Sequence, residues 1–232
     1  MTLLKLQLEI RYKPILDFHE RIRTIMAPHL KVAAYGINNA GTFDENAMLQ
    51  YKDEGYAIDI RHDRIVFIGE NKTENIYSEN GQLYHYLKLF DAISKLETFV
   101  VVTNTIFAVV NLFESKKSKI DIVNSFRKTN IQTNIPDFEK PFKDLAIHLT
   151  YNEPDSNFRV QYGPFVPETD ILNYGLNIFN SKERESLKEK SGILSQCILI
   201  EKCSEFDIDL FRRMDKKVNH YVKELKEKVC QE

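Results

Sequence analysis

The succession of strand and helix patterns, which occurs twice along the chain, constrains the fold more than any other feature. Residues 4–10 alternate leucine or isoleucine with polar side chains, the pattern of a half-buried strand. Apolar residues at helical spacing over 15–26 predict a helix next, and a further strand follows it. Three apolar runs within 47–68 predict an antiparallel meander, and residues 83–96 predict a second amphipathic helix.

The second half begins with the most apolar stretch, 99–113, whose β-branched and aromatic residues predict a long central strand. A short helix is expected over 118–128, and Asp207 and Asp209 are expected to begin a long amphipathic helix at the end of the chain. Residues 181–191 are interpreted as a charged, solvated connection. The remaining strands are expected at 145–151, 158–162, 172–179 and 193–200.

These patterns predict an α+β fold made of two similar halves, residues 1–98 and 99–232, packed as one compact unit. Each half would place its amphipathic helices on one face of an antiparallel sheet. The opposite face of each sheet would then have to pack against something else. We expect the other half, a second subunit or a ligand to cover it.

Composition excludes several classes of protein. The 232 residues carry a formal net charge of −2, so no global basic field attracts nucleic acid or an anionic membrane, although a local patch remains compatible with this balance. No continuous apolar segment reaches the roughly 20 residues of a membrane span. Three cysteines, Cys197, Cys203 and Cys230, are too few for a disulfide framework and indicate reduced thiols in the cytosol.

One local pattern is typical of a catalytic site. An apolar strand ends in Glu-x-Lys, at Glu70 and Lys72, with Asp59 and Asp63 upstream. Restriction-endonuclease-like nucleases use this arrangement, in which two carboxylates hold Mg²⁺ and a lysine orients the attacking water. Glu70 and Asp63 would be the metal ligands, and Glu20 could add a further one. The alternative interpretation is a solvated strand end beside a turn.

The remaining polar clusters point to surfaces rather than catalysis. Four basic residues on the polar side of the last helix could bind phosphate or a partner, namely Arg212, Arg213, Lys216 and Lys217. No two histidines have metal-ligand spacing, and the glycines form no phosphate-binding loop. We therefore expect no cofactor, and Mg²⁺ only if the nuclease hypothesis is correct.

The overall plan resembles a sporadically distributed family of bacterial and archaeal proteins of unknown function. The similar points are the first strand with Pro14 after it, the segment Val101 to Asn111, and the segment Ile198 to Lys217. In that family the middle strand carries an Arg-Tyr-apolar-Asn run, of which this chain keeps only Asn111. The resemblance implies an association with mobile or defence gene neighbourhoods and supplies no catalytic residues.

Together these features predict a cytosolic, non-catalytic binding or interaction protein, with a role in phage defence, toxin neutralisation or mobile elements. A protein is the expected partner, and a homodimer is an option. Net charge does not favour nucleic acid, and a membrane partner is not expected. Two alternatives remain open: the Mg²⁺-dependent nuclease, and a small-ligand sensor with an aromatic pocket.

Overall fold

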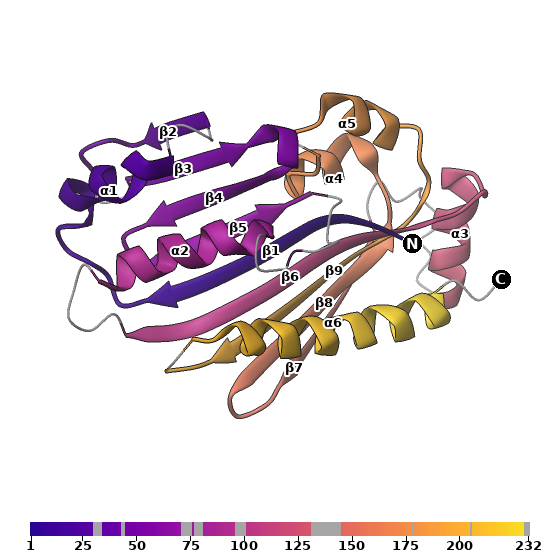
Figure 1. The fold of residues 1–232 in the computed structure, drawn as a ribbon. Coiled ribbons are helices and arrows are strands. Elements are labelled where there is room, and N and C mark those ends of the chain that lie inside the picture. The colour runs from indigo at the N-terminus through magenta and orange to yellow at the C-terminus, as the bar shows by residue number, and fades with distance from the viewer. Residues whose placement is uncertain are drawn as a thin grey trace.

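The computed structural model describes residues 1–29, 34–42, 45–70, 76, 81–95, 101–130, 145–177, 179–204 and 206–229 (Figure 1). Its strands form one antiparallel sheet in the order β2-β3-β4-β5-β1-β6-β9-β8-β7. The strands are β1 (Thr2–Tyr12), β2 (Ala34–Asn38), β3 (Asn46–Tyr51), β4 (Tyr56–Arg61), β5 (Arg64–Gly69), β6 (Val102–Glu114), β7 (Ile147–Asn152), β8 (Ser156–Pro164) and β9 (Gly192–Lys202). The α+β prediction is confirmed.

The helices are α1 (Phe18–Met26), α2 (Gln82–Ser94), α3 (Lys119–Asn130), α4 (Pro167–Asn173), α5 (Ser181–Leu187) and α6 (Ile208–Val229). Two short 3-10 turns, η1 (Ala27–His29) and η2 (Lys52–Glu54), follow α1 and β3. None of these described helices is long and apolar enough to cross a membrane.

The first strand of each half lies at the centre of the sheet. β1 pairs with β6, so that Gln7 lies opposite Ala108 and Leu8 opposite Phe107. β5 then flanks β1, and β9 flanks β6. The strands before residue 98 therefore occupy one side of the sheet and the later strands the other, joined by backbone hydrogen bonds at the β1–β6 seam (Figure 1).

Alternation along the strands creates two different sheet faces. On the first face, Leu6, Leu8 and Ile10 are buried in the main core. The same core contains apolar residues of α1, α2, α3 and α6, including the fully buried Phe211 and Val218. This first face is thus covered by the four helices, and Figure 1 shows α2 and α6 lying along it.

The second face carries a smaller apolar cluster at one end. A β-bulge between Leu3 and Lys5 turns Leu4 to this face, where it packs with Leu112 of β6. Residues from the β8–β9 connection complete the cluster, including Ile171 of α4 and Leu187 of α5. Among the described helices, α4 and α5 are therefore the pair that packs on the second face, near the start of β1.

The β8–β9 connection differs from the expectation. Residues 172–179 were expected to form a strand, but the helix α4 spans the start of this range and turn structure follows it. Pro167 at the first helical positions and acidic residues in the first turn favour the helix. The stretch 181–191 is also more than a solvated connection, because it contains α5, whose first turn is capped by the Asn180 side chain accepting from the Glu183 N–H at 3.2 Å.

Candidate functional site

Four cationic side chains form a row across the second face, at the end of the sheet far from α4 and α5. Strand pairing places Arg61 of β4 beside Arg64 of β5, and Arg64 beside Arg11 of β1. Arg11 pairs with Asn104 of β6, which pairs with Lys202 of β9. At about 4.8 Å between strands, this cationic row extends over roughly 19 Å.

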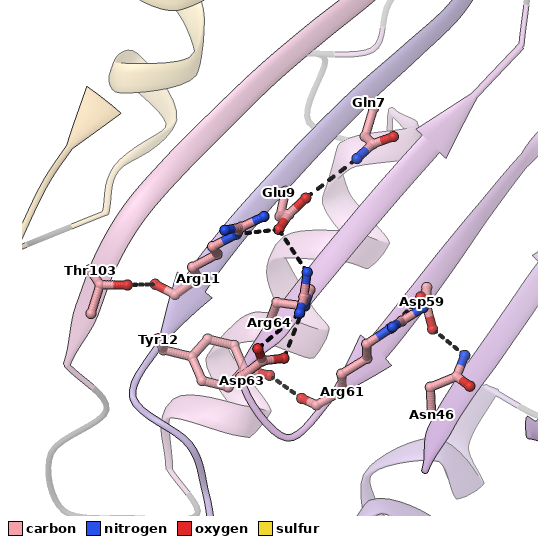
Figure 2. A network of polar contacts seen from close by, with 10 residues as sticks. All are labelled: Gln7, Glu9, Arg11, Tyr12, Asn46, Asp59, Arg61, Asp63, Arg64 and Thr103. Atoms are coloured by element: carbon pink, nitrogen blue, oxygen red, sulfur yellow. Dashed lines mark hydrogen bonds and ion pairs between the residues drawn. The ribbon is translucent and has the colours of Figure 1, made fainter. Parts of the chain in front are cut away.

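Buried Glu9 positions two of these arginines (Figure 2). Nε of Arg11 donates to Oε1 of Glu9 at 2.6 Å, and Nη1 of Arg64 lies 3.6 Å from the same oxygen. Gln7 donates to the other carboxylate oxygen at 3.3 Å. The Glu9 side chain is only 6% exposed, whereas those of Arg11 and Arg64 are 43% and 31% exposed. The acid is thus held inside the face while the guanidinium groups reach solvent.

Asp59 plays the same part for Arg61. Its carboxylate accepts from Nε of Arg61 at 3.0 Å and from the Asn46 amide at 2.6 Å. The carboxylate side chain is 8% exposed and the arginine 44%. The hydroxyl of buried Tyr12 also donates to the Arg61 carbonyl at 2.7 Å. These contacts fix both the backbone and the side chain of Arg61.

Asp63, in the β4–β5 turn, forms a bidentate ion pair with Arg64. Nε and Nη2 of Arg64 donate to its two oxygens at 2.9 and 3.0 Å. Burial alone would raise the pKa of Asp63, but the hydrogen bonds and charge of Arg64 outweigh this and hold the pKa below its usual value. The bidentate geometry also restricts the guanidinium plane.

Beside the cationic row, the second face carries amide and β-branched side chains. The next register position across the sheet holds, in strand order, Asp59, Val66, Glu9, Ile106 and Ile200. One step further, Ile68, Gln7, Ala108 and Ile198 lie side by side. The isoleucines at 68, 198 and 200 are half-buried rather than enclosed. This surface can therefore combine apolar contact and amide hydrogen bonding with a row of guanidinium and ammonium groups, whose three arginines are paired with the acids Glu9, Asp59 and Asp63.

The Glu-x-Lys residues are not gathered on this surface. Asp63 precedes β5 and Glu70 follows it, so the strand separates them by about 23 Å at roughly 3.3 Å per residue. Asp59 lies opposite Val66, partway along β5. Lys72 lies outside the described residues, and among the described residues no three His, Cys, Asp or Glu side chains form a metal-binding group.

Glu70 instead belongs to the packing of α4 and α5. Its buried carboxylate accepts from the Phe179 backbone N–H, at 3.2 and 3.4 Å to the two oxygens. The Lys5 ammonium group interacts electrostatically with the Glu70 carboxylate and donates a hydrogen bond to the Tyr174 carbonyl at 2.8 Å. Burial lowers the pKa of Lys5, and the negative charge of Glu70 opposes that shift. Glu20 lies on α1, which packs on the opposite sheet face.

The basic cluster of α6 is a looser surface. Arg212 is paired with Asp209 at 2.9 Å, and Lys217 with Glu153 at 3.1 Å. Arg213 and Lys216 are exposed. No buried acid of the described residues positions these groups as Glu9 and Asp59 position the arginines, so their binding of phosphate or a partner stays a prediction.

Sequence reasoning missed the cationic row. Its signal was the spacing Gln7-x-Glu9-x-Arg11, which puts three polar side chains on one strand face, and the pair Asp59-x-Arg61. The alternation over residues 4–10 was interpreted only as that of a half-buried strand. Only the pairing of β1, β4 and β5 shows that they form a single array.

The comparisons with known proteins correct the family resemblance. No family model matches the sequence. A stretch of 86 residues is 34% identical to the uncharacterised protein R161 of Acanthamoeba polyphaga mimivirus, covering 34% of this chain and 20% of the viral protein. The chain thus spans about a fifth of that relative. The resemblance to a bacterial and archaeal family is wrong, because no model supports it and the relative found is viral.

Proposed function

We propose that the protein is a non-catalytic binding protein that holds double-stranded DNA against the second face of its sheet. The observation that carries the proposal is the cationic row of Arg61, Arg64, Arg11 and Lys202, whose arginines are held by the buried acids Glu9 and Asp59. Guanidinium groups fixed in this way lose little conformational freedom when they bind phosphate.

The side chains next to the row support a duplex as the ligand. Proteins that bind DNA through strands use amide and arginine side chains to contact the groove and apolar side chains to press against base steps. Gln7, Ile68 and Ile198 are placed for such contacts, since they lie on the same face two register steps from the row.

The arrangement of the sheet supports the same ligand. The central strands β1 and β6 are antiparallel, and each side of the seam continues with a strand from its own half of the chain. The row therefore draws its charges from both halves, with Arg61, Arg64 and Arg11 from the first and Lys202 from the second, so that one ligand would contact both. A net charge of −2 means that attraction must come from the local row, so binding should depend strongly on salt.

A reducing, cytosolic location is part of the proposal. Cys197 and Cys203 are free thiols, and burial raises the pKa of Cys197 to about 12, so this thiol is unreactive at neutral pH. The proposed links to phage defence, toxins and mobile elements depended on the bacterial resemblance and are not carried forward. A protein partner on the same face is the competing occupant.

The test is fluorescence anisotropy of a labelled 20-base-pair duplex titrated with the protein at several salt concentrations. The double variant Arg61→Gln, Lys202→Gln removes two row charges whose side chains are exposed. We expect at least tenfold weaker binding and a salt slope reduced by about two, one for each lost phosphate contact.

The matched control is Arg213→Gln, Lys216→Gln, which removes the same charge from α6. The dissociation constant of this control variant for the duplex should stay within about twofold of the wild-type value. Absence of duplex binding at low salt, or equal losses in both variants, would rule out the sheet face as a DNA site. In that case, capture of a protein by wild type but not by the row variant would identify the competing occupant.

A further inference from the structure

A hollow lies on the first face, away from the cationic row. It has a volume of about 920 Å³, within the range of small-molecule sites. Its walls come from α3, the C-terminal half of α6, and the outer strands β7 and β8. The proposed DNA surface is on the opposite face, so this cavity is independent of it.

The floor of the cavity is apolar and aromatic. Phe126 of α3 packs edge-to-face against Tyr162 of β8, with ring centroids 5.8 Å apart. The buried Val160 and Ile193 also line the cavity, as does Tyr221 of α6. Burial raises the pKa of Tyr162 further above the neutral range, so its hydroxyl is protonated at neutral pH and can donate a hydrogen bond.

The rim of the cavity carries an excess of positive charge. Lys116 and Lys117 lie just before α3, and Lys228 lies on the last turn of α6. Among the described residues, none of these three ammonium groups is in an ion pair, whereas the two acids of the lining are engaged. Glu114 accepts from Thr2 and Lys190, at 2.6 and 3.0 Å, and Glu224 lies 3.3 Å from His220.

We propose that this cavity binds a small amphipathic carboxylate, with its hydrocarbon body on the aromatic floor and its carboxylate at the lysine rim. The apolar floor disfavours strongly hydrated anions such as free phosphate, because Phe126, Val160 and Ile193 offer no hydrogen bonds to replace the hydration lost on entry. The rim selects against cations, since three ammonium groups repel positive charge.

Dodecanoate is the probe, measured by isothermal titration calorimetry on the full-length protein, with dodecyltrimethylammonium as the cation of equal chain length. We expect saturable binding of one dodecanoate and at least tenfold weaker binding of the cation. The variant Lys116→Glu, Lys117→Glu should weaken dodecanoate at least twentyfold, since two attractive charges become repulsive. Lys182→Glu on the exposed start of α5 is the control and should bind as wild type does.

A second variant separates the cavity from general surface charge. Ser125 is an exposed α3 residue of the lining, and Ser125→Trp would fill the hollow. It should abolish dodecanoate binding while duplex DNA binding and the circular dichroism spectrum stay unchanged. The proposal is overturned if dodecanoate does not bind, if the cation binds equally well, or if the folded Ser125→Trp protein binds dodecanoate normally. Should Ser125→Trp not fold, the lysine variants decide by themselves.

Discussion

At the scale of single residues, Glu9 is the side chain on which the cationic row depends. It is nearly inaccessible and shared by Arg11, Arg64 and Gln7. Replacing it with glutamine removes the charge but keeps the shape. We expect Glu9→Gln to destabilise the protein by about 1–3 kcal/mol, because both arginines lose a buried acceptor but keep access to water.

The measurement is the urea midpoint at unchanged slope. Glu185→Gln is the control, since that carboxylate is 68% exposed and pairs only with Lys188 of the described residues, so its midpoint should not move. A Glu9→Gln midpoint equal to that of the wild type would show that the buried carboxylate does not organise the row.

The pair formed by Asp63 and Arg64 predicts a pH dependence. The pKa of the Asp63 carboxyl group is lower in the folded protein than in the unfolded chain, where it is near 3.9. The ion pair therefore contributes its full stability above about pH 3.9 and loses it as the pH falls through the folded-state pKa. Asp63→Asn should therefore be destabilising at pH 7, and its difference from wild type should shrink as pH falls from 4 towards 2. Thermal melts of both proteins over this range are the measurement, and a constant difference would contradict the ion pair.

At the scale of elements, α6 combines a cap with a buried stripe. The Leu210 N–H donates to Oδ1 of Asp207 at 2.6 Å, and Phe211, Met214, Val218 and Val222 are buried. Asp207→Ala should cost about 1 kcal/mol, because the first turn loses its acceptor. Asp207→Asn retains a capping oxygen and should cost much less, so chemical denaturation that ranks the two variants equally would show that the cap does not contribute.

At the scale of the whole molecule, the β1–β6 seam makes one sheet out of the two predicted halves. Removing either half would expose the full edge of a long, apolar central strand. We expect one cooperative unfolding transition for the intact chain, with equal calorimetric and van't Hoff enthalpies. A fragment of residues 1–98 should aggregate or stay unfolded. Two resolved transitions, or a folded fragment, would show that the halves are independent domains.

Individual elements were largely predictable from the sequence, whereas α4 was not. The stripe of α6 and the alternation of β1 repeat over many residues, so each pattern reports its own structure. Residues 172–179 mix a few apolar side chains with no clear period, and a short run of this kind fits a strand or a helix equally well. The helix that begins at Pro167 is stabilised by packing of Ile171 against Leu4 and Leu112, which are far away in the chain.

The candidate sites, too, depend on contacts between distant segments that local sequence patterns do not report. The proposed Glu-x-Lys site was built from residues adjacent in sequence, yet β5 itself separates Asp63 from Glu70. The hypothesis of a small-ligand sensor named an aromatic pocket but no residues for it. The rim of the cavity of α3, α6 and β8 joins Lys117 to Lys228, which no local pattern could bring together.

The sequence by itself determined the α+β class, the two-faced strands and the amphipathic helices, because these depend on the periodicity of neighbouring residues. Only the tertiary structure decided that β1 lies between β5 and β6, and hence that Arg11 lies beside Arg64. The physical reason is that strand register is set by backbone hydrogen bonds between distant segments and by shared burial of their apolar faces. The cationic row exists only once that register is formed.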